Sequence, residues 1–381
     1  MIPIRPGFGI PLVLAAGLVL AACAPGRGLE AMRVLADIDA GFAPSRLKET
    51  TPAPTRTAVV WSSGGAPRRA DLYRPGETAS GRLVLVPGVA ETGKDDPRLV
   101  ALATTLARAR FAVLVPDLGE LRALRVHGRD GREIADAVLR LGALDVTPPD
   151  APLGVVAVSY AVGPAVLAAL EPDTRDRIDF VVGIGGYYDI EAVVTFFTTG
   201  AYRLVPGGVW QRRKPNAYGK WVFVLSNLDR VADARDRVAL EAIARRRLAE
   251  LDADVSDLVA GLGPEGRAFQ AVIENADPER TPALIAALPA PVRAEIAALD
   301  LAGRDLTRLE ARLLLVHGRE DDIIPFSESR ALARAAGPGR ADLFLVDGFS
   351  HVDPDPVATD RFQLWRAIYR LLELRDRKAG G

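Results

Sequence analysis

Short, continuously apolar runs alternate with helical stretches along most of this chain of 381 residues. Because these runs have no polar side, they are typical of strands that are buried on both faces of a sheet. Strands separated by helices favour right-handed crossovers and a parallel sheet covered by helices. We therefore predict an α/β fold with a mostly parallel central sheet flanked by helices. The strands are expected at residues 83–86, 112–115, 153–158, 180–184, 313–316 and 343–346, and the main helices at 97–110, 131–141 and 357–374.

The sheet is expected to begin with an antiparallel strand pair. Residues 57–61 and 68–73 have strand character, and Gly64 and Gly65 between them are typical of a tight turn. Residues 24–56 are predicted to be a tether that leads into the fold, because the prolines in its second half lack backbone donors and resist a packed helix.

A long insertion interrupts the alternation after the strand at 180–184. Ala244, Leu248 and Leu251 recur at helical intervals with charged residues between them, which predicts amphipathic helices. We interpret this insertion as a helical lid. The core of the fold is accordingly assigned to residues 57–195 and 309–381, and the lid to residues 196–308.

The first 23 residues resemble a bacterial export signal. Arg5 precedes an apolar stretch at 10–20, which is about half the ~20 residues that a membrane-spanning helix needs. The sequence that ends at Cys23, Leu-Ala-Ala-Cys, resembles the lipobox, in which cleavage leaves an acylated cysteine. We predict a signal peptide over 1–23, lipidation of Cys23, and attachment to a membrane of the cell envelope, facing the periplasm or at the outer membrane. A plain secretory signal with an incidental cysteine is the alternative.

Composition narrows the possible partners. The 48 basic and 49 acidic residues nearly cancel, so no long-range field favours nucleic acid or an anionic membrane surface. Cys23 is the only cysteine, which excludes an internal disulfide framework and a thiolate-rich metal site. A functional site must therefore be sought in particular side chains.

A hydroxyl stands where a predicted strand meets a helix. Ser159 follows the strand at 153–158 and has small neighbours, Ala157, Ala161 and Gly163. A strained strand-to-helix turn would project this hydroxyl beyond the carboxyl end of the sheet, where open parallel sheets bind ligands. Ser159 is thus a candidate nucleophile, which needs a base to remove its proton. A serine that caps the following helix is the structural alternative.

The chain offers three histidines as that base. His351 follows the last predicted strand and is our candidate, although an ordinary surface histidine is possible there. His317 ends a strand before Gly318 and is interpreted as a residue that structures its loop. His127 lies in a charged connection, and no role is assigned to it.

Several of these segments together resemble the α/β-hydrolase superfamily. The turn at Ser159 is similar to the G-x-S-x-G elbow, with alanines in place of both glycines. Residues 317–325 resemble the segment H-G-x-x-D-x-x-V-P, and residues 71–75 resemble the Asp-Leu-Tyr-Arg-Pro stretch of the dienelactone-hydrolase and prolyl-peptidase-like branch. The resemblance covers about 57–374. It implies acyl transfer through a serine ester, without a metal or a cofactor.

The resemblance also implies roles for single residues. Asp321 takes the position of the acid that orients the base, and His351 takes that of the base. Asp322 and Asp189 stay open as alternative acids, because a triad is recognised by geometry and not by position. Ser159, Asp321 and His351 then form the predicted catalytic triad.

Two backbone N–H groups are expected to stabilise the oxyanion. One belongs to Tyr160, which follows the nucleophile. The other belongs to Val89, or alternatively Ala90, in the loop after the strand at 83–86. The superfamily usually has His-Gly where this chain has Pro87 and Gly88, but the donors are main-chain groups, so this difference bears little on the mechanism.

The expected function is that of a carboxylesterase-like serine hydrolase with a small-molecule acyl substrate. An amidase or peptidase would use the same triad, acyl transfer to another acceptor stays open, and a catalytically inactive, lipid-anchored binding module would retain the same fold. The sequence leaves the oligomeric state open. Aromatic residues of the lid can line an acyl pocket or pack the lid's own core: Phe196, Phe197, Tyr202, Trp210 and Trp221.

Overall fold

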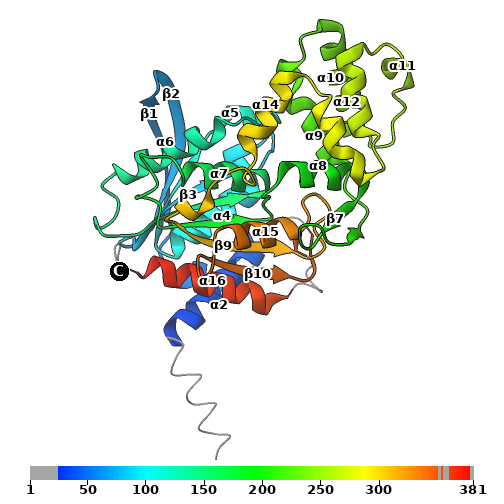
Figure 1. Cartoon of the computed structure of the whole chain (residues 1–381). Coiled ribbons are helices and arrows are strands. Elements are labelled where there is room, and N and C mark those ends of the chain that lie inside the picture. The colour runs from blue at the N-terminus through cyan, green and yellow to red at the C-terminus, as the bar shows by residue number, and fades with distance from the viewer. Residues whose placement is uncertain (1–24, 351–352, 355–359, 378–381) are drawn as a thin grey trace, which may run out of the picture.

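The computed structural model describes residues 25–350, 353–354 and 360–377, and a twisted sheet of eight strands lies at its centre (Figure 1). The second strand runs antiparallel to both of its neighbours, and all other neighbouring strands are parallel. The predicted mostly parallel sheet with an antiparallel entry is therefore confirmed. In spatial order the strands are β1 (Thr55–Ser63), β2 (Ala66–Arg74), β4 (Phe111–Pro116), β3 (Gly81–Val86), β5 (Leu153–Val158), β6 (Phe180–Ile184), β9 (Arg312–Gly318) and β10 (Ala341–Val346).

Helices cover both faces of this sheet, which explains why its strands are apolar throughout. In β3, Leu83 and Leu85 belong to one buried layer, and Val84 and Val86 belong to the other. The first layer is completed by α2 (Pro25–Ala40), α4 (Pro97–Arg108) and α16 (Arg361–Arg375). The second is completed by α6 (Asp130–Gly142), α7 (Val162–Ala168) and α15 (Ser327–Ala335).

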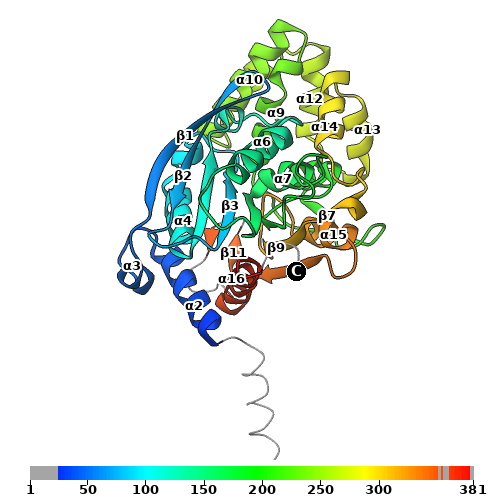
Figure 2. The same ribbon diagram turned by 90° about the vertical axis from the view of Figure 1, so that its left-hand side faces the viewer.

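The segment expected to be a tether is folded instead. Residues 25–40 form α2, which packs between α4 and α16, and α3 (Arg46–Thr50) follows it (Figure 2). Ala31 and Val34 of α2 are buried, and the buried carboxylate of Asp37 accepts a hydrogen bond from Thr105 of α4 at 2.6 Å. The tether prediction is therefore wrong for residues 25–50, because an apolar face at helical spacing fills the space between two other helices. Cys23 and the rest of the predicted signal peptide lie outside the described residues.

The insertion between β6 and β9 is mainly helical and rises above the carboxyl ends of the strands (Figure 1). We call residues 185–311 the cap. It has an apolar core of its own, to which Trp221, Leu240 and Phe269 contribute. The lid boundaries at 196 and 308 stay a prediction. The cap contains α8 (Ile190–Thr199), β7 (Ala201–Arg203), β8 (Trp210–Arg212), α9 (Tyr218–Ser226), η3 (Leu228–Arg230), α10 (Ala234–Ala249), α11 (Ser256–Val259), α12 (Pro264–Ile273), η4 (Pro278–Arg280), α13 (Thr281–Ala286), α14 (Ala290–Leu299) and η5 (Leu306–Arg308).

Short elements complete the connections: η1 (Gly93–Asp95), α5 (Gly119–Arg122), η2 (Ser159–Ala161), β11 (Phe349–Ser350) and β12 (Asp353–Pro354).

In the part of the chain that the structure describes, no single helix combines the length and the apolar character that crossing a membrane requires. Residues 278–286 and 290–299 pass that test only as a pair bent by 120°.

Candidate active site

Ser159 lies at the junction of β5 and η2 in a strained backbone conformation. Its φ angle is +57°, a region that residues other than glycine rarely occupy. Ala157 and Ala161 on either side are fully buried, so small side chains allow the close passage of helix and strand that glycines would. Gly163 lies against the ring of Tyr187, and a Cβ atom added there would stand 2.1 Å from the Tyr187 hydroxyl. The tight turn that the sequence suggested is present.

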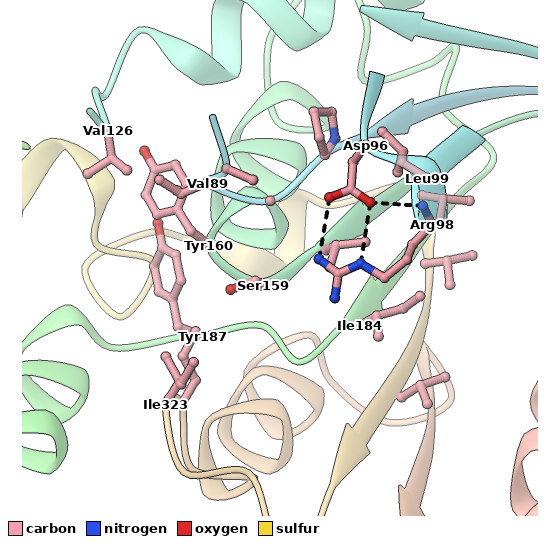
Figure 3. Close-up of a pocket in the computed structure, with 18 of the residues that line it drawn as sticks. Val89, Asp96, Arg98, Leu99, Val126, Ser159, Tyr160, Ile184, Tyr187 and Ile323 are labelled. Atoms are coloured by element: carbon pink, nitrogen blue, oxygen red, sulfur yellow. Dashed lines mark hydrogen bonds and ion pairs between the residues drawn. The ribbon is translucent and has the colours of Figure 1, made fainter. Parts of the chain in front are cut away.

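The loop after β3 passes beside this serine. A Cβ atom added to Gly88 would lie 3.6 Å from the Cβ of Ser159, so the loop approaches the hydroxyl closely (Figure 3). Val89 follows, and its carbonyl accepts a hydrogen bond from the Tyr218 hydroxyl of α9 at 3.3 Å. Among the described residues, neither the Val89 N–H nor the Tyr160 N–H donates to a protein acceptor.

Tyr160 is held by a buried acid that the sequence did not single out. Its hydroxyl donates to Asp130 Oδ2 at 3.0 Å, and the same oxygen accepts the N–H of His127 at 2.9 Å. Burial raises the pKa of Asp130 to about 7, and it raises the pKa of Tyr160 well above its ordinary value. The Tyr160 ring stacks on Tyr187 with centroids 6.0 Å apart. Tyr160, the residue after the predicted nucleophile, is thus fixed on two sides.

Asp321 is completely buried in the turn after β9. Its Oδ1 accepts the N–H groups of Ile323 and Ile324, each at 2.9 Å, and these two bonds orient the carboxylate. Its Oδ2 lies 3.3 Å from His317 Nε2. Ile323 and Ile324 line the same cavity as Ser159, so the turn brings the predicted acid to the edge of the site.

The alternative acids have other surroundings. The Asp189 side chain accepts the N–H of Ala192 and caps α8, and burial raises its pKa. Asp322 is half-buried, and its carbonyl accepts the N–H of Asn216 at 2.7 Å. The Asp189 carboxylate is therefore engaged in capping α8, whereas the Asp321 carboxylate is held by a turn that lines the cavity.

The histidines have different environments. His317 is buried, with Nδ1 2.7 Å from the Ser329 hydroxyl and Nε2 2.9 Å from the Ile324 carbonyl, as expected of a residue that structures its loop. His127 lies between Glu120 and Arg230. His351, the predicted base, lies outside the described residues.

The chain leading toward His351 is tied to the turn that holds Asp321. The Gly348 N–H donates to Glu320 Oε2 at 2.9 Å, and the Arg319 N–H donates to the Val346 carbonyl at 2.9 Å. Arg319 also pairs with Asp347 at 3.0 Å. The segments after β9 and β10 therefore leave the sheet side by side.

A cavity of about 520 Å³ contains this site, within the range of small-molecule pockets. Its lining is mainly apolar, and Ser159 lies on it between the Val89 loop and the end of β5 (Figure 3). Of the five lid aromatics considered from the sequence, only Phe197 lines the cavity, whereas Phe196 and Trp221 are buried elsewhere. Two other aromatic residues, Tyr218 and Phe223 of α9, line the cavity as well. The sequence around them did not indicate that they would face a cavity. Among the described residues, no three His, Cys, Asp or Glu side chains are grouped so that they could hold a metal ion.

Comparison with known proteins supports the fold. No protein-family model and no curated protein matches the chain. Similar solved structures include the α/β hydrolase GrgF from Penicillium sp. sh18, with 15% identity over 86% of this chain and 100% of that chain and a TM-score of 0.50. The 2,6-dihydroxy-pseudo-oxynicotine hydrolase has 14% identity over 86% and 68% and a TM-score of 0.47. Dienelactone hydrolase from Anabaena variabilis ATCC 29413 has 15% identity over 84% and 98% and a TM-score of 0.44.

The similarity to GrgF covers the whole length of that α/β hydrolase, and this chain has a mostly parallel central sheet flanked by helices. The chain has the α/β-hydrolase fold.

Proposed function

We propose that the protein is a serine hydrolase that cleaves a carboxylic ester through an acyl-enzyme intermediate. The observation that carries this proposal is the placement of Ser159. It occupies a strained elbow in an apolar cavity, beside the Val89 and Tyr160 N–H groups, which donate to no described protein acceptor. Strain at such a position is costly, and it is expected where exposure of a nucleophile requires it.

In the proposed reaction, Ser159 Oγ attacks the ester carbonyl carbon and its proton passes to His351, whose position lies outside the described residues. The carbonyl oxygen becomes an oxyanion that accepts hydrogen bonds from the N–H groups of Val89 and Tyr160. His351 then gives the proton to the departing alcohol as the carbon–oxygen bond breaks. Water attacks the acyl-serine by the same route and releases the acid. Asp321 orients the imidazole and stabilises its positive charge.

Labelling with a fluorophosphonate probe tests the nucleophile. The wild-type protein should be labelled, while Ser159→Ala and His351→Ala should not. Ser226→Ala is the matched control, because Ser226 also lines the cavity but donates its hydroxyl to the Leu124 carbonyl at 3.2 Å. A folded wild-type protein that stays unlabelled would favour the inactive binding module.

A panel of aryl esters and the corresponding anilides distinguishes an esterase from an amidase or peptidase. We expect the esters to be hydrolysed with the higher kcat/KM. The cavity lining is mainly apolar and contains few groups that would recognise a peptide backbone. Faster cleavage of the anilides would replace the esterase proposal with the amidase alternative.

Lipid attachment at Cys23 is proposed from the sequence. Expression in a bacterial host with a lipoprotein export pathway should give a detergent-soluble membrane form whose N-terminal peptide carries acyl groups, and Cys23→Ser should abolish both. A secreted, unacylated wild-type protein would support the plain secretory signal.

A further inference from the structure

The cavity at Ser159 extends well beyond the proposed reaction centre. Figure 3 shows Tyr160 and Tyr187 on one side of Ser159, and Leu99 and Ile184 on the other. The lining continues on the second side between the sheet and helices α2, α4 and α16. We call this part the α2 arm, and it is lined by Leu35, Ile38, Leu102, Leu364, Ala367 and Ile368.

The other part of the cavity lies under the cap and is more polar. Phe197 and Phe223 line this cap arm together with Ser226 and Asn227. The Asn227 amide nitrogen donates to the Phe223 carbonyl at 2.8 Å, and its Oδ1 is buried without a hydrogen-bond partner among the described residues. The polar side chains of Ser226 and Asn227 make the cap arm more polar than the α2 arm.

Charged groups on the lining are already paired. Asp39 pairs with Arg361 at 2.5 Å, where the α2 arm reaches the surface. Glu295, in the cap arm, pairs with Arg230 at 2.8 Å. Asp96 accepts hydrogen bonds from Arg98 at the start of α4. These pairs leave the interior of the α2 arm to aliphatic side chains, which would bind a hydrocarbon chain and reject a charged group.

We propose that the α2 arm binds the aliphatic acyl chain of the ester, and that the alcohol part lies in the cap arm. This inference rests on the proposed esterase function and adds the substrate class, an ester of a medium- or long-chain fatty acid. Helix α2 contributes the wall farthest from the sheet. The arm ends near Ile38, whose side chain is 38% exposed. A chain long enough to reach Ile38 would emerge at the surface.

Chain-length dependence of the kinetics is the first test. Each methylene group that enters the arm is worth about 0.8 kcal/mol, so KM should fall roughly threefold to fourfold per added methylene until the arm is full. Aryl esters of acetate, butyrate, octanoate and dodecanoate would be compared. Equal kcat/KM for acetyl and octanoyl esters overturns the inference.

Two variants place the chain in the α2 arm. Ala367 is buried on α16, so Ala367→Phe should fill the arm, lowering kcat/KM for the octanoyl ester at least tenfold and changing that for the acetyl ester less than threefold. Ala36→Phe is the matched control, because Ala36 is exposed on α2 and does not line the cavity. Ile38→Glu, at an exposed position where folding should be unaffected, should weaken only the longest chains. Unchanged octanoyl and dodecanoyl kinetics in both variants overturn the inference.

Binding of dodecanoate to Ser159→Ala separates this inference from the proposed reaction. Calorimetry should detect binding that Ala367→Phe weakens at least tenfold and Ala36→Phe does not. If dodecanoate binds in this way but no ester is hydrolysed, the esterase proposal fails and the acyl site stands. If acetyl esters are hydrolysed but dodecanoate does not bind, the acyl site fails and the esterase stands.

Discussion

Tyr160 and Asp130 are joined by a hydrogen bond of 3.0 Å from the tyrosine hydroxyl to Oδ2 of the acid. The acid is buried at the start of α6, and the tyrosine follows the proposed nucleophile in η2. Through this bond, helix α6 helps to fix the peptide whose N–H we propose for the oxyanion. We therefore expect the Tyr160 side chain to position the backbone N–H that we propose as an oxyanion donor.

Loss of this hydrogen bond should affect the chemical step more than substrate binding. We expect Tyr160→Phe to lower kcat about threefold to tenfold with little change in KM, because a less rigid N–H costs part of the roughly 3 kcal/mol that one oxyanion donor supplies. Steady-state kinetics with a short-chain ester measures both constants. Tyr202→Phe, which changes a tyrosine that does not line the cavity, should leave kcat unchanged. An equal effect of both substitutions would contradict the positioning role.

Asp130 should also make stability depend on pH. Its pKa rises from 3.8 to about 7 on folding, because burial disfavours the ionised form. The folded state thus holds the proton more tightly, so this contribution is complete below pH 3.8 and is lost as the pH rises to about 7. Asp130→Asn keeps an oxygen acceptor for Tyr160 and His127 but removes the titration.

Urea unfolding at several pH values measures this effect. Between about pH 4 and pH 8, the unfolding free energy of the wild type should fall relative to that of Asp130→Asn, by at most about 4 kcal/mol. Burial also raises the pKa of Glu328 to about 7. Relative to Glu328→Gln, the unfolding free energy of the wild type should therefore also fall as the pH rises. Parallel pH curves for the wild type and Asp130→Asn would show that Asp130 is ionised in the folded protein.

Neighbouring acids after β9 should differ in their effect on activity. Asp321→Asn keeps a side-chain oxygen for the Ile323 and Ile324 N–H groups but removes the charge, and we expect kcat to fall by about 10³- to 10⁴-fold. Asp322→Asn is the control and should change kcat less than threefold. Circular dichroism would verify that both variants are folded. The opposite ranking would assign the acid to Asp322, and a large loss in Asp189→Asn alone would assign it to α8.

The strained elbow should cost stability. Ser159→Gly removes the steric penalty at φ +57°, so we expect a gain of about 0.5–1 kcal/mol in unfolding free energy together with complete loss of hydrolysis. Ser62→Gly is the control, because it makes the same substitution at an exposed position of β1 where φ is not positive. It should lower the unfolding free energy by about 0.5–1 kcal/mol. Thermal unfolding of both variants gives the comparison. A destabilised Ser159→Gly would mean that the side chain of Ser159 stabilises the fold by more than its backbone strain costs.

Local patterns were enough to predict the sheet and the elbow. A strand buried on both faces has no polar positions, and this is visible in residues 153–158 without knowledge of the neighbouring strands. The expected strand pair at the start of the sheet was also recovered, with Gly64 at φ +58° and Gly65 at φ +77° in the turn. The sequence also carries a helical signal for α2, because Ala31, Val34, Leu35 and Ile38 recur at helical spacing. The prolines on which the tether prediction rests begin at residue 44, after this helix has ended.

By itself, the sequence determined the alternation of strands and helices and the position of a hydroxyl at the end of β5, because both follow from residues close together in the chain. Only the tertiary structure decided that Asp130 holds Tyr160, that a turn anchors Asp321, and that α2 forms a wall of the cavity. These relationships join segments far apart in the chain or depend on the direction of a side chain. Periodicity tells which face of an element is apolar, whereas packing decides what that face meets and where space remains for a ligand.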